Sequence, residues 1–161
     1  MKKILLQLKV PLGACLFLAM SLLFLPSCKK DDVYRSDIFI KKQWKLNLSS
    51  TNVIPALANK DDHAVAMVYL MSNKELHYDI YFDRPLENGD SPTTVKLYFG
   101  ESGQTGELFL DLNAPSFNAQ RETKGKVLLD EPNFLKIQTA KIYCQVSSTQ
   151  QQSGLVRDQL N

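Results

Sequence analysis

Hydrophobic and polar side chains alternate along many short segments of this chain, and this period of two restricts the fold more than any other feature. A strand points successive side chains to opposite faces, so alternation predicts strands with one buried and one exposed face. The clearest alternation lies in segments 44–49, 76–83, 94–99 and 107–113. Further strands are predicted at 63–72, 125–129, 141–147 and 155–160.

Turn-forming residues separate these segments. Gly, Asn and Ser, which favour turns, gather at 72–74, 87–90, 100–106 and 153–154. The only helix expected is a short turn around residues 130–135. About eight strands within roughly 120 residues predict an all-β domain over residues 41–161, built as an antiparallel sandwich or barrel.

The first 27 residues have the three parts of a secretory signal peptide. Three lysines lie among the first nine residues, an apolar run follows over 12–25, and Ser27 is a small residue at the cleavage point. An uncleaved transmembrane anchor is the alternative. Spanning a bilayer takes about 20 apolar residues, and this run is shorter and is interrupted by Gly13.

The end of the leader resembles a lipobox, the motif that marks bacterial lipoproteins. Leu25, Ser27 and Cys28 match it, and Pro26 occupies its variable position. The resemblance implies that the thiol of Cys28 receives diacylglycerol, that the bond before it is cut, and that the new amine is acylated, for example with palmitate. Two or three acyl chains hold a protein stably on a membrane, whereas one binds marginally.

Residues 28–40 are expected to form an acylated tether. Lys29, Lys30, Asp31 and Asp32 resemble the acidic export signal of some surface lipoproteins, which implies an outer-membrane location with export to the cell surface. The alternative is an ordinary charged spacer. Lys29 follows the cysteine directly, so the aspartate that retains lipoproteins at the inner membrane is absent there.

Charge and cysteine content exclude some roles for the mature chain. Without the three leader lysines, 16 basic and 17 acidic residues remain, which gives no electrostatic reason to expect a nucleic-acid partner. Cys15 leaves with the leader and Cys28 takes the lipid, so Cys144 has no partner for an internal disulfide. We expect Cys144 to be a small buried residue, with a reactive thiol as the alternative.

The segment 43–160 resembles the CHRD domain, a family common in bacterial secreted proteins. Its opening strand and proline correspond to residues 44–48 and Ile54-Pro55, and its Gly-rich turn corresponds to 100–106. The closing match is the most specific: Tyr143, followed by Gly154-Leu155-Val156-Arg157-Asp158-Gln159-Leu160. The resemblance implies a Greek-key β-sandwich similar in shape to the copper–zinc superoxide dismutases.

Three positions that usually hold histidine in the family hold other residues in this chain. The family usually has two histidines two residues apart and a third in a later strand, where this chain has Lys96, Tyr98 and Ser147. The resemblance therefore implies no metal site and no metal cofactor here. Asp158 also replaces the usual glycine between Arg157 and Gln159.

The candidate ligand-binding residues lie on exposed strand faces. His77, Asp79 and Asp83 share one face by their even spacing and are suited to an ion site, with a solvated outer face as the alternative. Tyr81 and Tyr98 occupy the polar register of their strands, where aromatic rings can stack on glycans or proteins. Tyr69 and Phe109 share this pattern, and the alternative for all four is cover for the sheet.

No residue pattern indicates catalysis. The chain has two histidines and no Gly-x-Ser-x-Gly motif, so we expect a binding or structural module outside the cytoplasm and not an enzyme. Its partners are expected to be membrane lipid through Cys28 and an envelope protein or glycan. Ion binding, glycan binding and an unrecognised active site are the alternatives.

Overall fold

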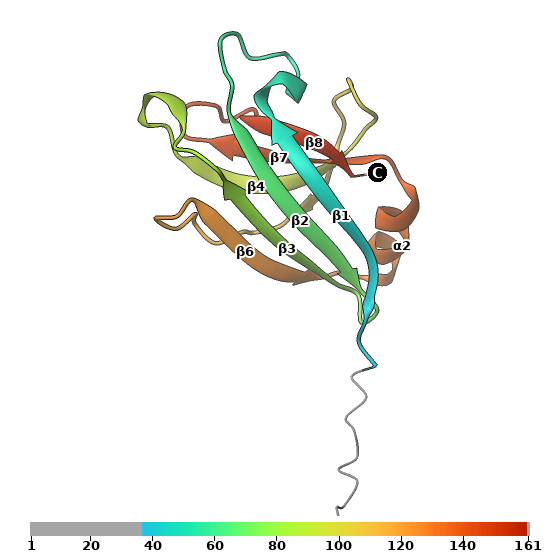
Figure 1. Ribbon diagram of the computed structural model, residues 1–161. Helices are drawn as coiled ribbons and strands as arrows, with labels where there is room; N and C mark the ends of the chain where they lie inside the picture. The colour runs from blue at the N-terminus through green and yellow to red at the C-terminus, as the bar shows by residue number, and fades with distance from the viewer. Residues whose placement is uncertain (1–36, 161) are drawn as a thin grey trace, which may run out of the picture. The chain divides into compact units, whose positions relative to one another are not determined.

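The computed structural model describes residues 37–160, which form eight strands, one α-helix and two short 3-10 helices (Figure 1). The strands are β1 (Ile40–Ser49), β2 (His63–Met71), β3 (Glu75–Phe82), β4 (Pro92–Phe99), β5 (Leu108–Asp111), β6 (Glu122–Leu128), β7 (Ile142–Ser148) and β8 (Val156–Leu160). The helices are η2 (Ser50–Asn52), η3 (Glu87–Gly89) and α2 (Glu131–Thr139). The expected signal peptide 1–27 and Cys28 lie outside the described residues.

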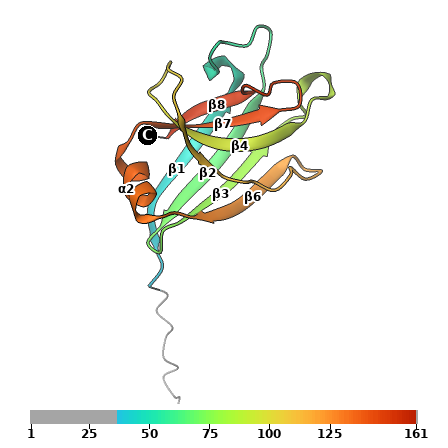
Figure 2. The same cartoon turned by 180° about the vertical axis from the view of Figure 1, so that it is seen from behind.

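The eight strands form one antiparallel sheet in the order β5-β4-β7-β8-β1-β2-β3-β6. The sheet curls over, so that β1, β2, β3 and β6 make one layer and β4, β7 and β8 lie behind it (Figures 1 and 2). At the junction between β1 and β8 the register pairs Ser49 with Arg157. The predicted all-β antiparallel class is confirmed, with a single folded-over sheet in place of two separate ones.

The alternation in the sequence sorts side chains between the inside of the curl and its outer surface. Trp44, Leu46 and Leu48 of β1 are buried, while the residues between them face outward. Other strands, α2 and the loop before β8 complete the core with Val68, Leu70, Ile80, Phe82, Val95, Leu97, Val146, Leu155, Phe134 and Ile137. Full burial of one such large side chain contributes roughly 1.5–3 kcal/mol.

Leu108 departs from its predicted place. Alternation put it on the buried side of its strand, but its side chain is 51% exposed. Leu97 pairs with Leu110 and Tyr98 pairs with Leu108, so Phe109 is an extra residue in β5. Such a bulge turns the strand and breaks the alternation beyond it.

Two other elements are longer than predicted. α2 extends to Thr139, where only a turn over 130–135 was expected; the Asp130 carboxylate caps it by accepting a hydrogen bond from the Asn133 N–H at 2.9 Å. β6 begins at Glu122 and not at 125. Its inward positions include Thr123 and Gly125, so hydrophobic alternation is weak there.

Candidate functional site

A shallow groove with a volume of about 390 Å³ lies on the outer face of β2, β3 and β6. The register places Tyr69, His77 and Lys126 side by side across the three strands. Asp79 and Lys124 form the next row. An aromatic ring, an imidazole, a carboxylate and two ammonium groups therefore meet on one surface, a composition suited to a polar ligand with an apolar face.

Glu75 fixes the polar groups at one end of this groove. Its carboxylate accepts hydrogen bonds from Lys126 Nζ at 2.6 Å and from His77 Nε2 at 2.9 Å. These bonds, the one from Lys126 first, lower the pKa of Glu75 to about 2. Glu75 was not among the predicted site residues, although its spacing of two from His77 places it on the same strand face.

The floor of the groove depends on the absence of a side chain at Gly125. A Cβ atom built there would lie 2.5 Å from the hydroxyl oxygen of Tyr78. That hydroxyl points inward and donates to the carbonyl of Leu112 at 3.4 Å. Glycine thus lets β6 approach the buried ring of Tyr78 closely.

The structure brings only part of the predicted residue set together. His77, Asp79 and Tyr81 lie on the outer face of β3, whereas Asp83 lies one residue beyond the end of that strand. Within residues 37–160, no three His, Cys, Asp or Glu side chains are grouped so that they could hold a metal ion.

Tyr98 lies in the other layer, away from the groove. Its ring stacks on Tyr143 with centroids 5.3 Å apart and planes 15° apart. The guanidinium of Arg157 lies 3.4 Å from the Tyr143 ring centre. Tyr98 therefore covers the outer side of β7, the alternative considered for it, and Phe109 similarly packs edge-on against Phe99 at 5.0 Å.

Arg157 and Gln159 of β8 hold the Gly-rich loop between β4 and β5. Arg157 is 3% exposed, and its Nη2 donates to the carbonyls of Glu101 and Gln104 at 3.2 and 2.5 Å. Gln159 Nε2 donates to the Gly100 carbonyl at 2.8 Å. Burial lowers the pKa of Arg157. These two side chains therefore fasten the Gly-rich loop to β8.

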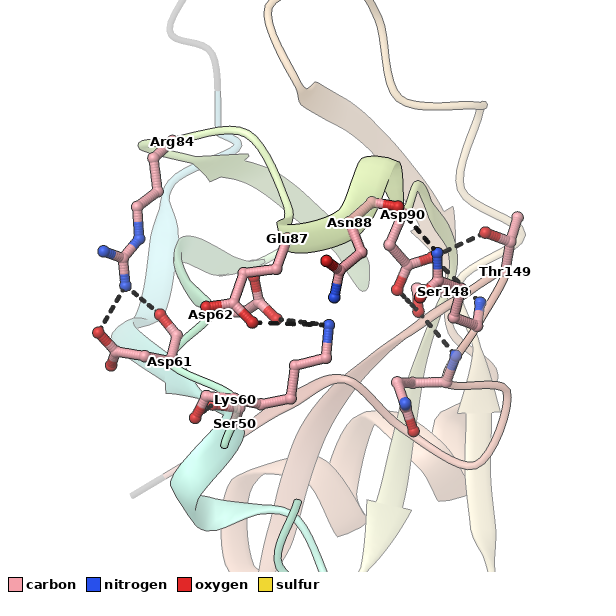
Figure 3. Close-up of polar contacts among 12 residues, drawn as sticks. Ser50, Lys60, Asp61, Asp62, Arg84, Glu87, Asn88, Asp90, Ser148 and Thr149 are labelled. Atoms are coloured by element: carbon pink, nitrogen blue, oxygen red, sulfur yellow. Dashed lines mark hydrogen bonds and ion pairs between the residues drawn. The ribbon is translucent and has the colours of Figure 1, made fainter. Parts of the chain in front are cut away.

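Figure 3 shows polar side chains on the loops that follow β1 and β3 and at the end of β7. The ammonium of Lys60 lies 3.7 Å from an Asp62 carboxylate oxygen and 3.8 Å from one of Glu87. Asp62 is 2% exposed, so this carboxylate is buried beside its cation. Arg84 binds the exposed carboxylate of Asp61 at 2.8 Å. The ion pairs of Lys60 with Glu87 and of Arg84 with Asp61 join the loop after β1 to the loop after β3.

Residues 44–160 match the CHRD domain. The chain belongs to the CHRD domain family. The comparison with curated proteins and that with solved structures each found no match. The family indicates a binding or structural module of the extracellular type, and it is in general not enzymatic.

Two of the three positions that the resemblance equated with family histidines lie near one another in this CHRD domain. Lys96 of β4 and Ser147 of β7 line one open depression of about 520 Å³. The Lys96 ammonium pairs with an Asp111 carboxylate oxygen at 3.4 Å, and Tyr98 is engaged with Tyr143. The side chains of Lys96 and Tyr98 are therefore both engaged in contacts within the domain.

Two further observations concern the described part of this CHRD domain. Cys144 is completely buried, and burial raises the pKa of its thiol to about 12. The expectation of a small buried residue is thus confirmed. Across residues 37–160, no helix has the length and apolar character needed to cross a membrane.

Proposed function

We propose that this protein is a bacterial cell-envelope lipoprotein whose CHRD domain acts outside the cytoplasm as a binding or structural module. The observation that carries the proposal is Leu25-Pro26-Ser27-Cys28 placed directly after the apolar run of the leader. Acyl chains on Cys28 hold the protein on the membrane. The family match begins at residue 44, so the folded domain and the anchoring segment occupy separate parts of the chain.

The proposed location is the outer membrane, with the domain exported to the cell surface. Lys29, Lys30, Asp31 and Asp32 support export because a lysine and two acidic residues stand soon after Cys28. The domain then acts through its position and its surface, with no chemical step assigned to it.

The anchor is tested with two cysteine variants made in the full-length precursor. Cys28→Ser should leave the protein unlipidated, so that it is released or accumulates as precursor. Cys15→Ser is the matched control, since it changes a leader cysteine that is removed on processing, and it should leave the protein in the membrane fraction. An unchanged membrane fraction for Cys28→Ser, with residue 28 unmodified in the native protein, would contradict the anchor. Protease treatment of whole cells shows whether the domain lies on the outer face of the outer membrane, because only a surface-exposed domain is digested.

A second proposal concerns the ligand, for which the groove favours a glycan. Tyr69 and His77 offer flat rings on which a sugar can stack, and Asp79 and Lys124 offer charged partners for its hydroxyl groups. On a glycan array, Tyr69→Ala should lose binding that the native protein shows. Tyr98→Ala, which alters an aromatic residue of the other layer, should retain it. Equal loss in both variants, or no glycan bound by the native protein, would refute this ligand class.

A further inference from the structure

Exposed hydrophobic side chains gather at one end of the domain. Of the seven large hydrophobic residues that are exposed within residues 37–160, five lie just before or at the start of β1, at the end of β6 and in α2. We call this group the basal patch: Ile38, Phe39, Ile40, Leu128 and Leu135, with exposed fractions from 48% to 72%. An exposed apolar cluster of this kind marks a surface that is covered in use.

Hydrogen bonds at the turn between β2 and β3 bring the first two parts of the patch together. The N–H of Ser72 donates to the Phe39 carbonyl at 2.8 Å, and the Phe39 N–H donates to Ser72 Oγ at 3.0 Å. The carbonyl of Lys74, in the same turn, accepts from the Leu129 N–H at 3.0 Å. The start of β1 and the end of β6 thus both contact this turn.

The helix α2 lies against the same end. Lys42 Nζ donates to the Gln138 carbonyl at 3.4 Å, and Lys41 Nζ lies 4.7 Å from the ring centre of Phe134. Lys74 pairs with Glu131 at 2.6 Å. Figures 1 and 2 show the start of β1, the β2–β3 turn and the start of α2 at the lower end of the domain.

We propose that the basal patch rests on the bilayer that holds the acyl chains of Cys28. This inference rests on the proposed lipid anchor. Only residues 29–36 separate Cys28 from the first described residue, and they span at most about 30 Å when fully extended. The chain enters the domain through Ile38, Phe39 and Ile40, so the anchor keeps this end of the domain near the membrane.

The charge around the patch indicates that the contact is apolar. Segments 37–42, 72–75 and 126–136 together contain five lysines and four acidic residues. This near balance gives little attraction to anionic headgroups. Burial of the apolar side chains at the interface drives the contact, while the lysines keep their ammonium groups in water. The contact should therefore be insensitive to salt, which screens only charges.

The test uses the acylated full-length lipoprotein with one added cysteine as a fluorophore site. Phe39→Cys and Leu135→Cys report the basal patch. Leu108→Cys is the matched control, because Leu108 is 51% exposed against 55% for Leu135 and pairs with Tyr98 in the other layer. Cys144 is buried and Cys28 carries lipid, so an environment-sensitive thiol reagent labels the added site. The proteins are placed in phosphatidylethanolamine–phosphatidylglycerol vesicles that contain lipids with a nitroxide quencher.

The expected result is a blue-shifted emission at Phe39→Cys and Leu135→Cys, with quenching by the lipid several-fold stronger than at Leu108→Cys, in low and high salt alike. Equal quenching at all three sites on vesicle-bound protein would overturn the inference and leave the anchor intact. A blue shift that grows with the amount of protein on each vesicle, without quenching by the lipid, would also overturn the inference. In that case a second copy of the protein, and not the bilayer, would cover the patch. Protein that does not float with the vesicles would refute the anchor itself.

Discussion

Asp90 is a buried acidic residue whose carboxylate holds together the loop before β4 and the loop after β7. It accepts hydrogen bonds from Ser148 Oγ at 2.6 Å, Thr149 Oγ1 at 2.7 Å, and the N–H groups of Ser91 and Gln150 at 2.8 and 3.0 Å. Burial raises the pKa of Asp90, but the donors outweigh it and leave the pKa below its usual value. The ionised form is therefore the one that stabilises the fold.

We predict that Asp90→Asn lowers the free energy of unfolding by about 2 kcal/mol at neutral pH, because an amide replaces an acceptor that binds four donors. The pKa is lower in the folded than in the unfolded state. The contribution is thus complete above the unfolded pKa of about 4 and disappears as pH falls through the folded value. Urea unfolding from neutral pH to about pH 2 should show the two proteins converging.

The exposed Asp79 provides the control for this prediction. Asp79→Asn should change the unfolding free energy by no more than about 0.5 kcal/mol. A difference between native protein and Asp90→Asn that stays constant across the acid range would contradict the role assigned to the ionised carboxylate.

The thiol of Cys144 should be unreactive in the folded protein. It is fully buried, and the raised pKa leaves almost no thiolate at neutral pH, the form that reacts. We predict no labelling by a thiol reagent in native conditions and rapid labelling in urea, measured by mass. Leu108→Cys, whose new thiol is exposed, should be labelled at once. Modification of Cys144 without unfolding would show that this part of the core opens.

Among the elements, β8 has an influence beyond its five residues because it holds the loop over residues 100–106. We predict that Arg157→Lys destabilises the protein by about 2 kcal/mol, since an ammonium cannot reproduce the planar contact with Tyr143 and the bonds to two carbonyls. Hydrogen exchange in residues 100–106 should become several-fold faster, as measured by mass spectrometry.

Arg84→Lys gives the comparison for Arg157→Lys. The Arg84 ion pair with Asp61 is exposed, and water screens such pairs so that they contribute little to stability. The exchange of residues 100–106 should stay unchanged in this variant. Similar effects of the two substitutions on the loop would mean that Arg157 does not hold it.

The strands could be predicted from sequence because alternation is a local property of each segment. Segments 63–72 and 76–83 correspond closely to β2 and β3. The exceptions are elements in which the local pattern is weak. The bulge at Phe109 exposes Leu108, which alternation predicts to be buried. At the start of β6, the inward positions hold Thr123 and Gly125, so no hydrophobic alternation marks the strand there. In α2, a capping aspartate and few apolar residues gave little periodicity.

The candidate site was predictable only in part, because alternation gives the face of a residue and not its neighbouring strand. The outward positions of His77 and Asp79 followed from spacing alone. Their neighbours Lys126 and Lys124 depend on the pairing of β3 with β6, which are far apart in sequence. Tyr98 had the same kind of pattern as Tyr81, yet the long-range pairing of β4 with β7 places it opposite Tyr143.

At the scale of the whole domain, apolar and polar surfaces lie at opposite ends of β1. This strand begins within the basal patch at Ile40 and ends at Ser49, about 30 Å away for a strand of ten residues. The loop beyond it leads to the buried ion pair of Lys60 and Asp62. If the patch rests on lipid, the polar loops point away from the membrane and the outer-face groove remains open to the surroundings.

The proposed location and the membrane contact of the basal patch both rest on lipid at Cys28, which can be measured by mass spectrometry of the N-terminal peptide from membrane-extracted protein. We expect a peptide that begins at Cys28 and carries the added mass of a diacylglycerol group and an amide-linked acyl chain. A mature protein that begins at Met1, or one with an unmodified residue 28, would contradict it.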